Sequence, residues 1–191
     1  NDDIYIFSDK KDLSRTIEIF GKKKIFGEKI VILGMGGIGL SVTKILEKNV
    51  KKRFHIKAIE SSKERALEAA DQLERTIVLN GDGLDEEVLN ESNIGLTDFF
   101  IAVTNDDKAN LLACARAKAL GCKFTMALIN DPSLSKLLTP MGVDSFINPR
   151  TTTVSSILRY IRHGMVKTVY SIGNGEAEVL EFQGMDSSPI I

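Results

Sequence analysis

The chain has 191 residues, of which 43% are hydrophobic and 27% charged, and its formal net charge is −1. This composition predicts a folded core, and the near-zero charge gives no support to binding of nucleic acid, so we expect no nucleic-acid partner. The apolar runs are too short to span a membrane, and no N-terminal segment has the layout of a signal peptide. The two cysteines, Cys114 and Cys122, cannot build a disulfide framework, and no Cys/His cluster suggests a metal. We therefore expect a reduced, cytoplasmic protein without a metal site.

The first residues predict a short strand and a helix that stand apart from the rest. Residues 4–7 are apolar, and a helix over about residues 10–20 would place Leu13, Ile17 and Phe20 on one face. One strand and one helix cannot form a core alone. Because the chain begins at Asn1 and stops soon after a new β-pattern, we expect a fragment of a longer protein, with this segment belonging to what precedes it.

From Lys29 onward, apolar strands alternate with helices. The expected strands are 29–33, 55–59, 76–79, 98–103, 123–129 and 144–147, and the expected helices are 37–48, 61–73, 85–91, 108–120 and 131–139. Two helix starts carry specific cues, a Ser61-x-x-Glu64 capping box and an Asp131 N-cap followed by Pro132. The alternation predicts an α/β fold with a Rossmann-type, doubly wound parallel sheet. The near-continuous apolar runs are typical of parallel strands that are buried on both faces.

Two further elements follow the sheet. A helix over 151–163 would carry an apolar stripe that includes Val154 and Ile157, and this stripe must bury itself on its own domain or on a partner subunit. Residues 166–172 and 176–182 predict a hairpin with its turn at Asn174-Gly175.

The first expected strand runs into a glycine loop that opens a helix. Gly34, Gly36 and Gly39 have the G-x-G-x-x-G spacing of dinucleotide-binding loops. The first glycine permits the tight turn, the second lets a pyrophosphate approach the backbone, and the third lets helix and strand pack closely. The free N–H groups of the helix N-terminus suit phosphates. The residues expected to hold the cofactor here are Gly34, Met35, Gly36, Gly37, Ile38 and Gly39.

An acidic residue and two turns complete the expected site. Glu60 ends the second strand, at the spacing after the glycine loop at which a carboxylate binds ribose hydroxyls. A carboxylate there also repels a 2′-phosphate, which favours NAD(H) or an adenosine nucleotide over NADP. The alternative is that Glu60 is an ordinary solvated residue. Asp82 and Gly83 follow the third strand and could meet the adenine, and Thr104 and Asn105 follow the fourth and could meet the rest of a dinucleotide. Either pair could instead be plain turn chemistry.

Taken together, four blocks resemble one family. They are Ile32–Gly39, then Ile59-Glu60 with Arg65, then Thr76–Gly83, then the Val103-Thr104-Asn105-Asp106-Asp107-x-Ala109-Asn110 run. The chain resembles the TrkA family, cytoplasmic regulatory subunits of Trk-type potassium uptake systems, whose domains are of the RCK or KTN type. One departure concerns Ser61, where relatives often have an arginine beside the adenosine, and it leaves the preferred nucleotide open.

The resemblance implies a domain order. Residues 1–27 would end a preceding small, RCK-C-like subdomain, 28–150 would be the Rossmann nucleotide-binding domain, 151–163 the crossover helix that packs on a neighbour, and 164–191 the truncated start of a second small subdomain. It also implies NAD(H) as the ligand, with ATP or ADP as alternatives. The resemblance further implies assembly into a dimer or tetrameric ring under an integral-membrane, TrkH-like potassium-translocating subunit. The chain would then lie at the inner face of the plasma membrane through this partner.

Three functions remain in competition. The first is a non-enzymatic regulatory module in which nucleotide binding gates potassium transport. The second is an NAD-dependent dehydrogenase that is truncated before its substrate domain, although no nucleophile elbow or Cys/His pair is visible and too little chain follows residue 148 to carry acid–base groups. The third is a purely structural half, against which the glycine loop and Glu60 argue. The roles of Arg116, expected on a solvated or intersubunit face, and of Arg150, at the ligand end of the sheet, stay open.

Overall fold

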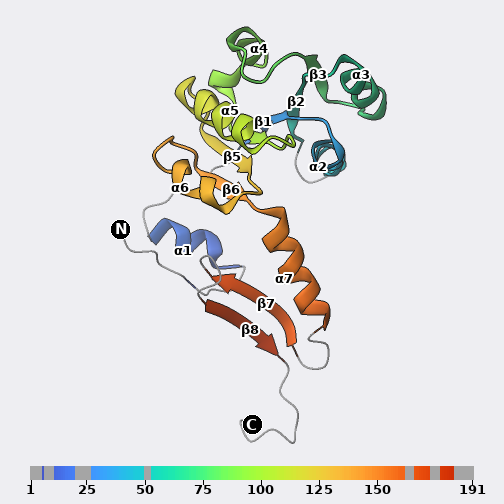
Figure 1. Cartoon of the computed structure of the whole chain (residues 1–191). Helices are drawn as coiled ribbons and strands as arrows, with labels where there is room; N and C mark the ends of the chain where they lie inside the picture. The colour runs from blue at the N-terminus through green and yellow to red at the C-terminus, as the bar shows by residue number, and fades with distance from the viewer. Residues whose placement is uncertain are drawn as a thin grey trace, which may run out of the picture.

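The protein is built around one parallel β-sheet, which carries helices on both faces (Figure 1). The computed structural model describes residue 6 and residues 11–19, 27–49, 53–161, 166–172 and 177–182. The sheet has six strands in the order β3-β2-β1-β4-β5-β6, and every neighbouring pair is parallel. The strands are β1 Lys29–Leu33, β2 His55–Glu60, β3 Ile77–Asn80, β4 Phe99–Ala102, β5 Phe124–Leu128 and β6 Ser145–Ile147. The predicted Rossmann-type sheet is confirmed.

The helices divide between the two faces of the sheet, and each face has its own core. They are α2 Gly37–Glu47, α3 Lys63–Gln72, α4 Glu86–Glu91 and α5 Asp107–Ala119, with the short pieces η1 Ile94–Leu96, η2 Pro132–Leu134 and α6 Ser135–Leu138. On one face, Ile30 and Ile32 of β1 pack with Ala69 of α3. On the other, Val31 and Leu33 pack in the cluster that holds the α4 and α5 side chains. Alternate residues of β1 thus bury on opposite faces, which explains the unbroken apolar run.

The strand order reverses beside β1, because β2 lies on one side of it and β4 on the other. In open α/β sheets, ligands bind at the carboxyl ends of the strands, at this switch point. The fold therefore predicts a ligand site at the loops that follow β1, β2, β4 and β5.

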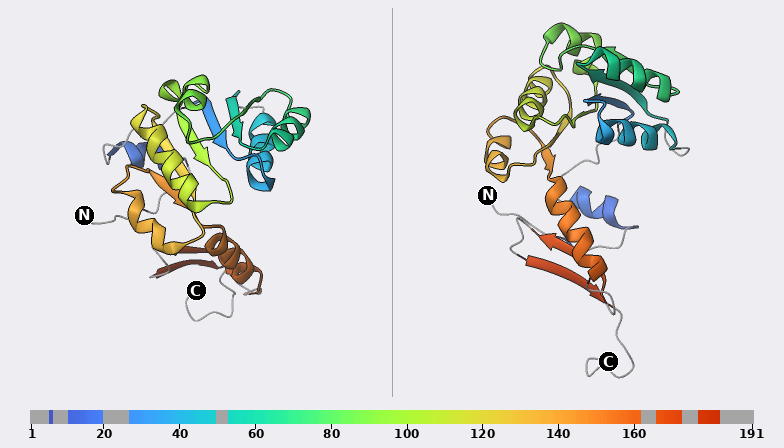
Figure 2. Two further views of the ribbon diagram at one scale, coloured as in Figure 1. Left: turned by 45° about the horizontal axis from the view of Figure 1, so that its top comes forward. Right: turned by 45° about the vertical axis from the view of Figure 1, so that its right-hand side comes forward.

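Two helices and a two-stranded pair lie outside the sheet and its helices. They are α1 Leu13–Ile19, α7 Pro149–Ile161 and the antiparallel pair β7 Val166–Ile172 and β8 Ala177–Phe182. Helix α7 leaves the sheet after β6 and runs toward β7 and β8 (Figures 1 and 2). The predicted hairpin pairing is confirmed, whereas its turn at Asn174-Gly175 and the expected strand at residues 4–7 fall outside the described residues. Among the residues that the structure describes, no helix has both the length and the apolar character needed to cross a bilayer.

Two predicted helix starts were wrong by one or two residues. Helix α3 begins at Lys63 with Ser62 as its N-cap, not with the Ser61–Glu64 capping box, because the Ser62 Oγ accepts from Arg65 N while the Ser61 hydroxyl donates to Glu60 Oε1 at 3.4 Å. Helix α7 begins at Pro149, not at 151, because the Asn148 side chain caps it. The expected cap at Asp131 is confirmed, since its Oδ1 accepts a hydrogen bond from the Ser133 N–H at 2.9 Å.

Candidate functional site

A pocket of about 470 Å³ opens at the carboxyl ends of β1, β4 and β5. It lies at the switch point of the sheet, where the fold predicts a ligand. Its wall combines the glycine loop, the end of β2 and the loops after β4 and β5. The lining residues are Leu33, Gly34, Gly36, Gly37, Ile38, Glu60, Ser61, Arg65, Val103, Thr104, Asn105, Leu128, Asn130 and Pro149.

The three glycines of the loop are needed for three different reasons. Gly34 has a φ of +93°, and a Cβ there would lie 3.0 Å from the Thr104 backbone nitrogen. A Cβ at Gly39 would collide with the carbonyl oxygen of Gly34, so this glycine lets α2 pack on the loop. A Cβ at Gly36 would meet nothing within 4 Å among the described residues, so neither strain nor packing requires this glycine. The open space in front of Gly36 is where the backbone could receive a ligand.

Helix α2 presents its N-terminus to the same pocket. Its N-cap is Gly36, which has no side chain to accept a hydrogen bond, and no acidic residue lies in its first turn. Gly37 and Ile38 line the pocket, and as first-turn residues of α2 their N–H groups have no carbonyl of the helix to donate to. An uncapped helix N-terminus is a ready site for an anion, so the wall fits the phosphates of a nucleotide.

Glu60 ends β2 and lies in the pocket wall with only 3% of its surface exposed. Its Oε2 accepts a hydrogen bond from the Met35 N–H at 2.8 Å, and its Oε1 accepts from Ser62 N and from the Arg65 guanidinium, whose Nη2 lies at 2.9 Å. Burial alone would raise the pKa of Glu60, but these hydrogen bonds and the Arg65 charge outweigh it and lower the pKa. The carboxylate is therefore ionised and holds the glycine loop to the end of β2.

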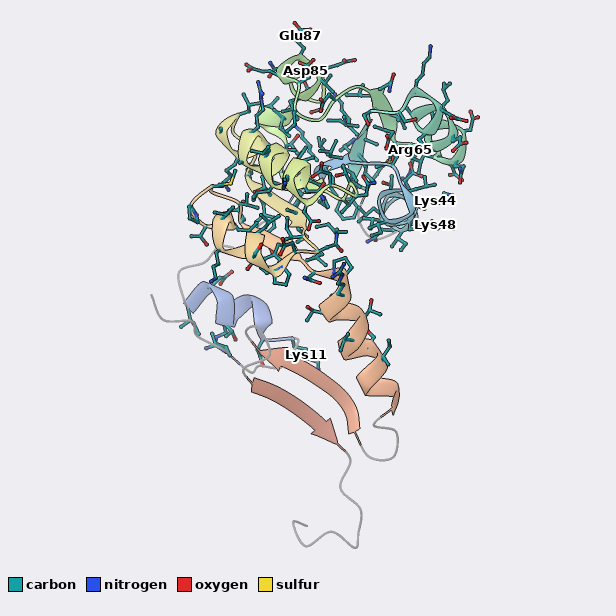
Figure 3. The ribbon with its side chains drawn as sticks, in the orientation of Figure 1. Lys11, Lys44, Lys48, Arg65, Asp85 and Glu87 are labelled. Carbon is teal, nitrogen blue, oxygen red and sulfur yellow. The ribbon has the colours of Figure 1, made fainter. Side chains whose placement is uncertain are left out.

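The predicted contact of Glu60 with ribose hydroxyls stays a prediction, and the geometry limits it. Oε1 already has several donors, whereas Oε2 has only Met35 N among the described residues and keeps room for one more. Arg65 is 56% exposed along its side chain and lies on the side of the sheet that carries α2 and α3 (Figure 3). It brings a positive charge to the wall beside Ser61. Sequence reasoning assigned Arg65 no role, although its place in the first turn of α3 puts it near the end of β2.

Asn110 fixes the loop that follows β4, and sequence reasoning missed it. This residue of α5 is fully buried, and its Oδ1 accepts hydrogen bonds from Thr104 N at 2.9 Å and Thr104 Oγ1 at 2.7 Å. Its Nδ2 donates to the Thr104 carbonyl at 3.0 Å and to the Leu128 carbonyl at 2.9 Å. One side chain thus clamps the ends of β4 and β5. In the sequence, Asn110 is notable only as part of the block that carries the family resemblance, and no role was assigned to it.

Asp107, also on α5, fixes the loop that follows β5. Its Oδ2 accepts hydrogen bonds from Asn130 N and Asp131 N, both at 2.8 Å, and its Oδ1 accepts from Asn130 Nδ2 at 2.9 Å. The wall residues Leu128, Asn130 and Pro149 were also missed, because only the folded sheet brings them to the pocket.

Several predicted residues lie elsewhere. Asp82 and Gly83 are not in the pocket wall: Asp82 Oδ1 accepts from Leu84 N at 2.9 Å, and a Cβ at Gly83 would collide with the Leu33 side chain. Turn geometry and packing account for this pair, and its contact with adenine stays a prediction. Arg116 forms an exposed ion pair with Glu86 at 2.9 Å. Met35 and Gly39 are buried behind the wall. Thr104 and Asn105 line it, and their contact with a dinucleotide stays a prediction.

Comparisons with known proteins agree with this arrangement. The model of the TrkA-N domain matches residues 30–149. The Trk system potassium uptake protein TrkA of Azorhizobium caulinodans is 39% identical over 187 residues, which cover 98% of this chain and 41% of that protein. The chain thus spans less than half the length of this relative.

Several solved structures share the fold. The TrkA-N domain of the inner membrane protein ybaL from Escherichia coli superposes with a TM-score of 0.64 at 14% identity, over 72% of this chain and 98% of that one. The GsuK channel bound to NAD gives a TM-score of 0.62 at 21% identity, over 78% of this chain and 26% of that one. The GsuK structure bound to ADP gives a TM-score of 0.57 at 22% identity, over 71% of this chain and 34% of that one. Because the family model matches residues 30–149 and the Azorhizobium protein is 39% identical, the chain belongs to the TrkA-N domain family.

Proposed function

We propose that the chain is a nucleotide-sensing regulatory part of a potassium uptake system. The observation that carries the proposal is the pocket at the switch point, in which the open backbone of Gly36 and the uncapped start of α2 face the ionised Glu60. This combination suits a ligand with both phosphate and ribose groups. The family membership, with relatives named for potassium uptake, supports the regulatory role.

The proposed ligand is NAD(H), with ATP or ADP as alternatives. The phosphates would lie at the N-terminus of α2, and the adenosine would lie on the Glu60 side, where Ser61 and Arg65 complete the wall. The likeness to a channel bound to NAD in one structure and to ADP in another supports both ligand classes on this fold.

The proposal treats the chain as non-enzymatic. On the side of the pocket away from Glu60, the lining residues of the described chain are Val103, Thr104, Asn105, Leu128, Asn130 and Pro149. None of these side chains titrates near neutral pH, whereas a dehydrogenase needs a proton donor beside the reacting carbon. This composition favours a ligand that is sensed over one that is consumed.

The assembly is proposed from the family and from one exposed surface. On α7, Val154 is 54% and Ile157 is 50% exposed, as expected of a crossover helix that packs on a neighbouring subunit. We extend this to residues 1–27 and 164–191 as parts of flanking small subdomains, residues 28–150 as the nucleotide-binding domain, and a dimer or tetrameric ring. This ring would lie beneath a TrkH-like membrane subunit at the cytoplasmic face of the membrane. Nucleotide binding can gate transport only if the ligand binds one conformation of the ring more tightly than another.

Calorimetric titration of the protein with NADH, NAD, ADP and ATP tests the proposal. Saturable binding of at least one nucleotide at physiological concentration, without turnover of NADH in the presence of common alcohols and hydroxy acids, is the expected result. Absence of binding by all four nucleotides would remove the sensing role, and turnover of NADH would replace it with a dehydrogenase.

A further inference from the structure

A second pocket, of about 260 Å³, opens at the opposite ends of the strands from the glycine loop. This amino-end pocket lies where β1, β2 and β3 begin, and Ser92 and Asn93, between α4 and η1, close one side of it. Its wall, as far as the structure describes the chain, contains no glycine and no residue of an α-helix. It therefore lacks the groups that suit the phosphates of a nucleotide.

One face of the sheet forms the floor of the amino-end pocket. Val31 of β1 pairs with Lys57 of β2, and Lys57 pairs with Ile77 of β3, so their three side chains point to the same face. This is the face that α4 and η1 cover, because Val31 packs in one cluster with Leu89 and Ile94. The cover stops before the amino ends of the strands, where Ile77 is 57% exposed.

A lysine at the centre of β2 is the unusual residue of this floor. Parallel strands with both faces covered are normally apolar, and the neighbours of Lys57 in β2, Ile56 and Ala58, are indeed buried. Lys57 Nζ donates to the Glu91 carbonyl at 2.8 Å, which holds the ammonium at the pocket. A neutral carbonyl satisfies one of the three donors of the ammonium and leaves its charge without a counter-charge.

Further basic side chains line the same pocket. They are Lys29 at the start of β1, His55 at the start of β2 and Arg75 ahead of β3. No carboxylate lines the described wall, and none of its four basic side chains forms an ion pair with another described residue. The amino-end pocket is therefore a local concentration of positive charge on a chain whose formal net charge is −1.

Two carboxylates bond the backbone of these basic residues but not their side chains. Asp98 Oδ2 accepts from Lys29 N at 3.0 Å, and its Oδ1 pairs with Lys123 Nζ at 2.6 Å. Glu47 Oε1 accepts from Arg75 N at 2.8 Å. Both carboxylates fix the position of the basic residues, and neither lines the pocket. The charges of the basic side chains remain available to a partner.

Two large apolar side chains accompany these charges. Ile77 is 57% and Leu96 is 67% exposed, and both line the pocket. An exposed apolar surface with a polar rim is typical of an interaction site. Pockets for drug-sized ligands usually measure about 300–1,000 Å³, so this smaller one suits one or two side chains of a protein partner.

From these features we infer that the amino-end pocket is a docking site for an acidic segment of a protein partner. The segment places an apolar side chain against Ile77 and Leu96 and a carboxylate among Lys29, Lys57 and Arg75. Charge complementarity of this kind governs partner choice and association rate. The inference goes beyond the proposed function and holds whether or not a nucleotide occupies the glycine-loop pocket.

Selection of random peptides displayed on phage, with the full chain immobilised, tests the site. The expected peptides combine Asp or Glu with Leu, Ile or Phe, and their binding weakens as salt is added. Fluorescence anisotropy of a labelled synthetic copy of a selected peptide measures its affinity for each variant. Lys57→Gln and Arg75→Gln should each weaken the peptide about fivefold through the loss of one charge pair.

Leu96→Ser should also weaken the peptide about fivefold, because it removes apolar contact area. Lys136→Gln is the matched control, since it removes an exposed lysine on α6 outside the pocket and should leave the affinity unchanged. Arg75 is exposed, so its variant keeps the test valid if thermal unfolding shows that Lys57→Gln is misfolded.

Three results would overturn the docking site. The first is that no peptide is enriched, and the second is that selected peptides bind the Arg75→Gln and Leu96→Ser variants as they bind wild type. The third is that vesicles of phosphatidylserine and phosphatidylcholine bind wild type and lose binding to Arg75→Gln, while selected peptides do not compete with them. That result would assign the basic side chains to a membrane surface.

Discussion

The two sides of the glycine-loop pocket differ in how their side chains are used. On the β2 side, Glu60 is at once the residue proposed to bind the ligand and the residue that holds the wall together, because its carboxylate bonds Met35, Ser62 and Arg65. On the β4–β5 side these tasks are divided. Asn110 and Asp107 of α5 hold the wall from behind, and Thr104 and Asn130 form its surface.

The difference predicts how mutations separate stability from ligand affinity. On the β2 side, one substitution should change both quantities together, because one carboxylate serves both. On the β4–β5 side, a change behind the wall should mainly cost stability, and a change on its surface should mainly cost affinity.

The largest expected effect lies behind the wall, at Asn110. Asn110→Ala removes the partner of the buried Leu128 carbonyl and of the part-buried Thr104 carbonyl and N–H. Unsatisfied buried groups of this kind cost about 3 kcal/mol in the free energy of unfolding. Urea unfolding monitored by circular dichroism measures the loss, with Asn90→Ala as an exposed control. A loss below about 1 kcal/mol would mean that water replaces the Asn110 amide and that the clamp is dispensable.

The glycine loop joins the two sides of the pocket. Substitutions of its glycines should separate ligand affinity from stability. Gly36→Ala fills the space proposed for the phosphates without meeting any described protein atom within 4 Å, so NADH affinity should fall while stability changes little. Loss of close backbone contacts to phosphate predicts a decrease of about a hundredfold.

Gly39→Ala is the opposite case, because its Cβ would collide with the Gly34 carbonyl. It should lower the melting temperature markedly, which thermal unfolding measures. If Gly36→Ala unfolds the protein as readily as Gly39→Ala, or binds NADH as wild type does, then Gly36 does not face a ligand.

Glu60→Gln should show the combined effect of the β2 side. The amide keeps much of the shape but loses the ion pair with Arg65 and turns one acceptor into a donor that faces N–H groups. We expect a stability loss of about 1–2 kcal/mol. NADH affinity should fall by about tenfold in the same variant. Denaturant unfolding and calorimetry on one preparation measure both, and a change in only one of them would break the comparison between the two sides.

A smaller and graded effect is expected from pH. Because the folded-state pKa of Glu60 lies below its ordinary value of 4.5, folding favours the ionised form. The contribution of Glu60 to stability is therefore fully present above that value and is lost as the pH falls through the lowered pKa. The stability difference between wild type and Glu60→Gln, measured by urea unfolding across this range, should shrink on acidification. A difference that stays constant down to the acid end would show that the charge of Glu60 contributes nothing.

The sequence predicted the β2 side of the site better than the other side, for a physical reason. Strand burial on both faces leaves apolar runs, and the glycine spacing with Glu60 some twenty residues later reflects local backbone geometry. The β4–β5 side depends on Asn110, whose amide bonds the Leu128 carbonyl, and on Pro149, which reaches the pocket only once β6 is in place. No local pattern encodes such contacts. The misplaced cap at Ser61 has the same origin, because the Ser61 hydroxyl donates to the carboxylate of Glu60 at the end of β2 and Ser62 becomes the cap.

The hydrogen bond between Glu60 and the Met35 N–H affects how fast a ligand can bind and where a conformational change can follow. The Met35 N–H bonds Glu60 at the end of β2, and Gly34 N donates to the Ile59 carbonyl at 2.8 Å. Because of these two bonds, the glycine loop has its conformation before a nucleotide binds. Binding there costs little ordering entropy and should proceed without a slow rearrangement. A sensor, however, needs some part that differs between the empty and filled states. The glycine loop therefore acts as a fixed anchor for the ligand. Any conformational change must occur in the residues that the rest of the ligand contacts.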